Sequence, residues 1–281
     1  MPAGGLPGQV YRVSPNGDSY GWSSSRIRVY SDLDIYVRTD GDDNNDGLEN
    51  TPDRALATIS KAINKSLDYD GAGYNVFIRV AKGTYNEGDL GVYPYHLANW
   101  RAFSIIGESR EETIVRANEG PAVFYIFEGG RLRIGNITAD VSGNSGYYAG
   151  HNGCLDLMNC GVSGNGYNLV NVGGMGLVRI TVGLKAVGSF MYGIGAVSPG
   201  GIMVMAGEHQ INCSFSHYFA CANRQGWISI EKAANTFNGS STGARYYAGS
   251  LSCIQTDGAP ADFLPGNKAG TVNTSVYGLL L

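Results

Sequence analysis

One short strand pattern returns at near-constant spacing through the middle of the chain, and this repeat constrains the fold more than any other feature. Each copy has an apolar, a variable and a second apolar residue, the period-2 signature of a half-buried strand. Successive copies begin 23, 23, 24, 26 and 23 residues apart, which predicts a solenoid. The six copies occupy residues 132–134, 155–157, 178–180, 202–204, 228–230 and 251–253.

The segments between the copies predict turns. They are rich in Gly, Asn and Ser, which supply corners with positive φ, as in residues 142–146, 163–166 and 238–241. No helix fits between the copies, so helix-containing repeats are excluded and a parallel β-helix remains. The variable residues Arg133, Asp156 and Arg179 then fall on one outward line, where we expect a ladder of alternating charges.

Composition agrees with one continuous folded domain. The 281 residues include 42 glycines, yet 43% hydrophobic residues exclude a disordered chain. A net charge of −4 without a basic patch gives no reason to expect nucleic acid as a partner. We expect no secretory signal at the amino terminus and no membrane insertion. The five cysteines, an odd number, are expected to be buried free thiols.

Three segments follow one another along the chain. Residues 1–30 are expected to form a small β appendage or linker, residues 31–257 the all-β solenoid, and residues 258–281 a carboxy-terminal segment. One amphipathic helix is expected over about residues 52–68, beginning at Pro52 with Asp53 in its first turn. Such a helix would cover the open apolar end of the first coil.

An acidic loop precedes this helix. Asp42, Asn44 and Asp46 alternate, Gly47 permits a sharp turn and Asp53 offers a closing carboxylate, a pattern similar to a calcium loop. The closing residue is Asp in place of Glu, and no helix precedes the loop. The alternative is an Asx turn that caps the following helix. Calcium is the only cofactor that the sequence suggests.

Several short segments carry a family resemblance. Near the start of the solenoid they are Tyr36-Val37, residues 40–47, Pro52, Thr58-Ile59, Ala62 and residues 80–85; nearer the termini they are residues 8–10, residues 16–18, Trp22 and residues 264–271. Together they resemble pectin-lyase-like right-handed parallel β-helix proteins, many of which are bacteriophage tailspikes or tail fibres. This resemblance implies a right-handed β-helix, location in the phage virion, and attachment to other tail proteins through the amino-terminal segment.

The catalytic residues of such proteins have no counterparts in this sequence. Lyases of this fold gather carboxylates on neighbouring coils to hold calcium, with an Arg or Lys as base, but here the acids fall on different lines. A glycosidase needs two carboxylates roughly 5 to 10 Å apart. The candidates for such a pair are Glu128 with Asp140, or one of these with an acid from a neighbouring subunit. The alternative is that these acids are only solvated surface charges.

The tyrosines follow the repeat more regularly than the acids do. Tyr167, Tyr192 and Tyr218 each precede the next copy of the repeat by 10 or 11 residues, so we expect them to stack on one edge. Tyr147-Tyr148 and Tyr246-Tyr247 occupy the comparable stretches of the flanking coils. An aromatic ladder packed into a corner is one interpretation. The other is a glycan-binding strip, because sugar rings stack on aromatic faces while their hydroxyls bond to nearby Asn and Ser.

The resulting hypothesis is a phage tail spike or fibre that adheres to a host cell-surface polysaccharide. A polysaccharide depolymerase of the same fold and a purely structural virion fibre are the alternatives.

The chain ends in Leu279, Leu280 and Leu281, an apolar tail that a partner must cover. Another copy of the chain is the economical partner, and the phage resemblance makes the expected assembly a parallel homotrimer.

Overall fold

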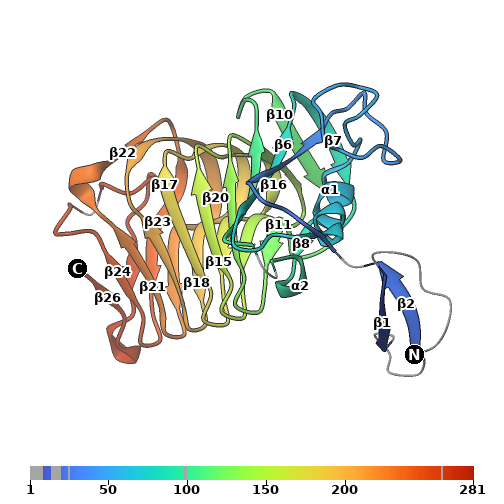
Figure 1. Ribbon diagram of the computed structural model, residues 1–281. Coiled ribbons are helices and arrows are strands. Elements are labelled where there is room, and N and C mark those ends of the chain that lie inside the picture. Colours follow the sequence, from blue (N-terminus) through green and yellow to red (C-terminus); the bar gives the residue numbers. More distant parts are fainter. Residues whose placement is uncertain (1–8, 14–19, 25, 98–99, 261) are drawn as a thin grey trace.

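A computed structural model describes the chain except residues 1–8, 14–19, 25, 98–99 and 261. Parallel strands stack into a solenoid along one axis, with the amino-terminal coils at one end and the carboxy-terminal coils at the other (Figure 1). The fold is therefore a parallel β-helix, as the repeat predicts. No helix in the described part of the chain is long and apolar enough to cross a membrane.

One wall of the solenoid is a ten-stranded sheet, in which each strand comes from a different coil. Its strands follow the order of the coils, and each is joined to the next by a crossover through the rest of the coil. They are β4 (Leu33–Val37), β6 (Asn75–Val80), β9 (Ala102–Gly107), β12 (Arg131–Gly135), β15 (Cys154–Met158), β17 (Leu177–Val182), β19 (Gly200–Val204), β21 (Gly226–Ile230), β24 (Cys253–Gln255) and β26 (Leu279–Leu280).

A twelve-stranded sheet forms the other two walls. Its long strands turn the corner between them, since β13 and β14 both pair with β16. The strands are β7 (Gly83–Glu87), β8 (Gly91–Val92), β10 (Thr113–Ala117), β11 (Ala122–Ile126), β13 (Thr138–Ser142), β14 (Ser145–Ala149), β16 (Gly161–Val172), β18 (Lys185–Val197), β20 (Gly207–Asn223), β22 (Asn235–Asn238), β23 (Thr242–Ala248) and β25 (Thr271–Val272).

The predicted register is confirmed for five of the six copies. Leu132, Leu155, Val178, Ile202 and Ile228 are successive Cα partners, and each is almost fully buried. The sixth copy is wrong by three residues. Ile254, rather than Leu251, is the partner of Ile228. Leu251 instead lies in a turn with φ 59° and is 60% exposed. Cys253 consequently lies beside Trp227 and is half-buried.

The predicted charge ladder is present in register but differs in its contacts. Arg133, Asp156 and Arg179 are successive Cα partners. Arg179 forms an ion pair of 2.6 Å with the buried Asp156 carboxylate. The second ion pair, at 3.0 Å, comes from Arg131, two residues before the predicted partner Arg133.

The helix that covers the first coil begins later than predicted. Helix α1 (Ile59–Lys65) has Thr58 as its N-cap and continues as the 3-10 turn η1 (Ser66–Asp68). Pro52 and Asp53 lie outside it, because the Leu56 N–H donates to the Tyr36 carbonyl of β4 and the Leu56 carbonyl accepts from the Arg38 N–H, both at 2.9 Å. The apolar face of α1 is Ile59, Ala62 and Ile63, which are buried in the core.

Both terminal segments contain strands. Strands β1 (Gln9–Val13) and β2 (Tyr20–Ser24) form an antiparallel pair that Figure 1 shows apart from the solenoid. The carboxy-terminal segment continues the solenoid, because β25 pairs with β23 and β26 with β24. The remaining short elements are β3 (Ile27–Arg28) paired with β5 (Tyr69–Asp70), helix α2 (Pro94–Leu97), and 3-10 turns η2 (Lys232–Ala234) and η3 (Thr274–Val276).

All five cysteines are free thiols. Cys160, Cys213 and Cys221 are buried, as predicted, whereas Cys154 and Cys253 are half-buried. Burial raises the pKa of Cys160 and Cys221 to about 11, so these two thiols stay protonated at neutral pH.

Candidate functional site

The acidic loop forms a turn and a helix cap. Asp42 accepts hydrogen bonds of 2.8 and 2.9 Å from the backbone and side chain of Asn44, and Asp46 forms a 2.6 Å ion pair with Arg54. Residues 26–97, 100–260 and 262–281 contain no group of three or more His, Cys, Asp or Glu that could hold a metal. The predicted calcium ligands Asp42, Asn44, Asp46 and Asp53 therefore do not form one site.

Asp43, which the calcium pattern skips, is the side chain that organises this loop. Its carboxylate accepts hydrogen bonds from the backbone N–H groups of Ala57 and Thr58, both at 2.9 Å, and from the Thr58 hydroxyl at 2.8 Å. Glu87 completes the cap, because its carboxylate accepts hydrogen bonds from the backbone N–H groups of Ile59 and Ser60. These contacts satisfy donors that the first turn of α1 leaves free.

The two candidate catalytic acids, Asp140 and Glu128, lie on different elements of the coil. Asp140 lies on β13 and is occupied by Arg116, at 2.6 Å, and by the Ser163 hydroxyl, at 2.9 Å. Glu128 is exposed in the turn between β11 and β12, with φ 60°. The whole of β12 lies between the two acids along the coil, and a catalytic role for Glu128 with Asp140 stays a prediction.

Two of the predicted glycan-binding tyrosines, Tyr147 and Tyr246, lie in the core. Tyr147 is fully buried, stacks on Phe124 at 6.0 Å and donates a hydrogen bond of 3.0 Å to the Ile137 carbonyl. Tyr246 is 8% exposed and is a Cα partner of the buried Ala220. For these two residues the corner-ladder interpretation is the correct one.

Tyr167 is exposed but lies off the predicted line. The Cα partner of Tyr192 on β16 is Asn168, so the line is displaced by one residue at this coil. Tyr167 is 56% exposed and lines a shallow groove of about 620 Å³ with several serines and two phenylalanines. The other lining residues are Ser142, Gly143, Asn165, Gly166, Ser189, Phe190, Met191, Ser214, Phe215 and Ser216.

Tyr192 and Tyr218 are Cα partners, as predicted, and both side chains are half-buried. Tyr218 stacks on Tyr247 with ring centroids 5.3 Å apart, and the Tyr192 ring lies 5.2 Å from the exposed His217 ring. The structure thus places Tyr247, rather than its neighbour Tyr246, at the surface of this coil. These three tyrosines form the first aromatic cluster of the site.

A second cluster lies nearer the amino terminus, on the coils of β8, β11 and β14. Phe127 is in edge contact with Tyr125 at 5.2 Å and with Tyr148 at 5.6 Å, and Tyr93 stacks on the exposed Tyr95 at 5.6 Å. Tyr148, rather than its neighbour Tyr147, is the surface residue here. Sequence spacing gave no signal for Tyr93, Tyr95 or Phe127, because they lie in turns and in α2 rather than on the repeat.

One line of Cα partners joins the two clusters, and we call it the tyrosine line. It crosses six strands along the solenoid axis. Four strand spacings separate Tyr148 from Tyr247, which gives a length of about 19 Å at ordinary strand spacing. Its residues are Tyr125, Tyr148, Asn171, Gly195, Cys221 and Tyr247.

The centre of the tyrosine line holds an unpaired polar atom. The Asn171 Oδ1 atom is buried and has no hydrogen-bond partner among the described residues. A Cβ atom on the adjacent Gly195 would come within 2.5 Å of Asn168 Nδ2 and 3.2 Å of Asn171 Oδ1. Glycine at this position therefore leaves room for two amide side chains between the aromatic clusters. An unpaired buried acceptor is costly unless a ligand or water bonds to it.

Hydrogen bonds fix the aromatic cluster at the amino-terminal end. The Tyr125 hydroxyl donates to Asp89 Oδ1 at 2.5 Å and lies 3.1 Å from the Tyr93 hydroxyl. Burial and the Asp89 carboxylate raise the pKa of Tyr125, which keeps its phenol protonated. His96 Nδ1 accepts the Tyr93 backbone N–H at 3.1 Å, and burial lowers the pKa of His96 to about 4. Its imidazole is therefore neutral at pH 7.

Comparisons with known proteins leave the family open. No family model matches the sequence, and no curated protein matches it. Among solved structures the chain is similar to pectin methylesterase PemA from Erwinia chrysanthemi, with 12% sequence identity and a TM-score of 0.40. The similarity covers 79% of this chain and 70% of that chain.

Proposed function

We propose that the protein is an adhesin of the β-helix type, which holds a polysaccharide chain along the tyrosine line. The observation that carries this proposal is the unpaired Asn171 Oδ1 between two clusters of tyrosine rings. Aromatic faces bind sugar rings and amides bind their hydroxyls. Strands are about 4.8 Å apart, close to the length of one pyranose residue, so successive sugars would meet successive coils.

Within this function, we propose the more specific role of a bacteriophage tail spike or fibre that adheres to a host cell-surface polysaccharide. The support is the resemblance of the opening and closing segments of the chain to phage tail proteins. In this role residues 1–30 attach the protein to other tail proteins in the virion, and the solenoid flank meets the host surface.

Tyr148→Ala and Tyr218→Ala are each expected to weaken glycan binding about tenfold, because each removes one stacking face. The measurement is calorimetric titration with purified capsular and lipopolysaccharide O-chain fragments, together with assays for new reducing ends and unsaturated products. Tyr30→Ala, at an 80% exposed tyrosine off the line, is the control. Wild-type binding by both Tyr148→Ala, on the line, and Tyr218→Ala, which stacks on the line residue Tyr247, would contradict the proposal. Appearance of cleavage products would replace adhesion by depolymerisation.

We further propose that the functional assembly is a parallel homotrimer. Leu279 and Leu281 pair with their own chain through backbone hydrogen bonds, yet their side chains are 51% and 57% exposed. Tyr277, at 73% exposed, extends this apolar surface, which a neighbouring copy would cover.

Replacing Leu279 and Leu281 together by Ser is expected to release monomers. The exchange removes exposed apolar surface while it leaves the backbone pairing of β26 intact. Light scattering coupled to size-exclusion chromatography measures the mass, with Leu48→Ser, at another exposed leucine, as the control. A double variant with the mass of a trimer would contradict this mode of assembly.

A further inference from the structure

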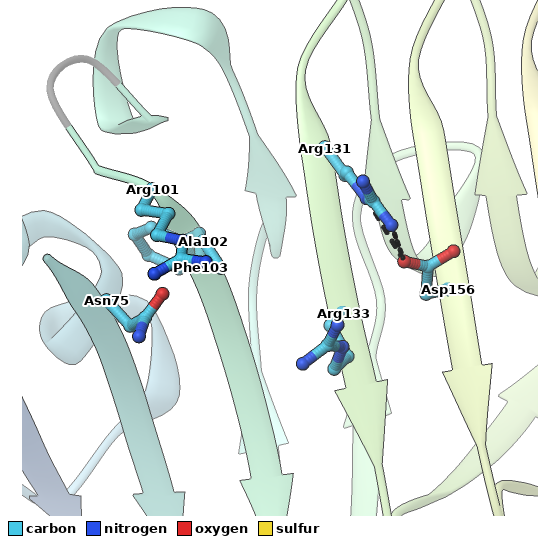
Figure 2. A pocket seen from close by; sticks show the side chains of 7 residues that line it. All are labelled: Asn75, Arg101, Ala102, Phe103, Arg131, Arg133 and Asp156. Carbon is cyan, nitrogen blue, oxygen red and sulfur yellow. Dashed lines mark hydrogen bonds and ion pairs between the residues drawn. The ribbon is translucent and has the colours of Figure 1, made fainter. Parts of the chain in front are cut away.

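A second groove lies on the outer face of the ten-stranded sheet, near the start of its strands. It has a volume of about 370 Å³ and spans β6, β9, β12 and β15 (Figure 2). Figure 2 shows Asn75 and Arg101 on one side and the Arg131, Arg133 and Asp156 side chains on the other. The lining residues are Asn75, Arg101, Ala102, Phe103, Arg131, Arg133 and Asp156.

The groove is positively charged on a protein that is acidic as a whole. Three guanidinium groups and one carboxylate line the groove, whereas the whole chain carries a net charge of −4. The single acid, Asp156, is only 4% exposed and already bonds to Arg131 and Arg179. Asp32 lies at the far edge, where the Asn75 amide donates to it at 2.9 Å. Hydrogen bonds from the Asn75 side chain and backbone, with a smaller contribution from Arg101, lower the pKa of the Asp32 carboxyl.

Arg133, like Arg101, is a guanidinium without an ion-paired carboxylate among the residues that the structure describes. It forms no ion pair with any residue that the structure describes, although Asp156 is its Cα partner on the next strand. On its other side, its partner Ser104 is fully buried, and the Ser104 hydroxyl has no hydrogen-bond partner among the described residues. An uncompensated guanidinium beside an unpaired hydroxyl favours an anionic, oxygen-rich ligand.

We propose that this groove binds the oxyanion of an acidic glycan, either a uronate carboxylate or a sugar phosphate. Arginine binds both groups through paired N–H donors, and Arg131 and Arg133 project from the same strand two residues apart. The inference rests on the proposed glycan binding and deepens it, because it names the sugar class. The site is on a different wall of the solenoid from the tyrosine line, so the two can be tested separately.

Arg133→Gln tests the site with an oligogalacturonate as the probe. Two companion ligands are used. One is the methyl ester of the oligogalacturonate, which has the same backbone without the charge, and the other is glucose 1-phosphate. We expect calorimetry to show binding of the acid form, at least about tenfold weaker binding of the ester, and a loss of about tenfold or more in acid-form affinity in Arg133→Gln. Arg116→Gln, at an arginine paired with Asp140 on the other sheet, should bind like the wild type.

The outcomes separate the two proposals. Binding of glucose 1-phosphate alone, lost in Arg133→Gln, would support the site and assign it to phosphate. Equal affinity for acid and ester, or an acid-form affinity that Arg133→Gln leaves unchanged, would overturn the inference. Failure of Tyr148→Ala and Tyr218→Ala to affect neutral glycans would count against the tyrosine line only. Raising the salt concentration should weaken acid-form binding and spare neutral glycans.

Discussion

Ile134→Asp is expected to prevent soluble folding. Ile134 is fully buried on β12, between its Cα partners Ile105 and Leu157, so aspartate there would place an unpaired charge in the core. Such a substitution costs several kcal/mol, a large part of the stability of an ordinary domain. The soluble fraction after expression and the far-ultraviolet circular dichroism of any recovered protein measure the effect.

Ser229→Asp is the matched control on the outward register. Ser229 is a Cα partner of Met203 and Gln255, on the line that alternates with the buried positions, and it is half-buried. Its replacement should leave a folded, soluble protein. Equal tolerance of Ile134→Asp and Ser229→Asp would mean that the inward and outward lines are misassigned.

Acid is expected to destabilise the protein between about pH 6.5 and pH 4, partly through His96. Burial holds the pKa of His96 at about 4 in the folded state, against an ordinary value of 6.5. Below pH 6.5 the unfolded chain therefore binds a proton that the folded chain does not, and stability falls as pH falls. The full contribution, reached near pH 4, is about 3 kcal/mol.

His96→Asn isolates this contribution. The Asn carbonyl can still accept the Tyr93 N–H that His96 Nδ1 accepts, but it does not titrate. Urea unfolding at a series of pH values should show a flatter acid limb in the variant than in the wild type. Some acid sensitivity remains, because burial also lowers the pKa of His209. His217→Asn, at an exposed histidine, is the control. If His96→Asn keeps the pH dependence of the wild type, His96 is not a cause of the acid sensitivity.

The repeat made the ten-stranded sheet predictable because one side-chain period governs every coil. The prediction failed at Leu251, where residues with positive φ lengthen the turn before β24 and shift the register by three. Step length alone cannot distinguish a longer turn from a longer strand. This ambiguity is greatest at the last copy of the repeat, because no regularly spaced copy follows it in the sequence to fix its register.

The tyrosines were harder to place for a related reason. Strands β16, β18 and β20 bend at the corner between two walls, where Leu169 and Val170 are both buried and the alternation of faces is interrupted. The pairing of β18 with β20 also shifts between Phe190 and Tyr192. The sequence placed the pairs Tyr147-Tyr148 and Tyr246-Tyr247 in the comparable stretches of the flanking coils, but spacing could not decide which member of each pair lies at the surface.

Other parts of the site carried little signal in the sequence. The alternating Asp and Asn residues of the acidic loop suit an Asx turn as well as a calcium loop, and only the contacts of Asp42 and Asp46 separate the two. The arginine groove gathers residues from coils about 30 positions apart. Arg131 and Arg133 share one outward face by their spacing, but Arg101 joins them only through the pairing of β9 with β12.

The uneven pairing between coils has a mechanical consequence. Hydrogen bonds between parallel strands lie along the solenoid axis, so an axial pull loads the boundaries between coils in series, and the weakest boundary yields first. In the middle, β16 and β18 pair from Gly161 to Val172, whereas β25 and β26 each pair with the preceding coil through only two residues. Under tension the solenoid should therefore extend from its carboxy-terminal coil, while the walls that carry the tyrosine line and the arginine groove stay intact.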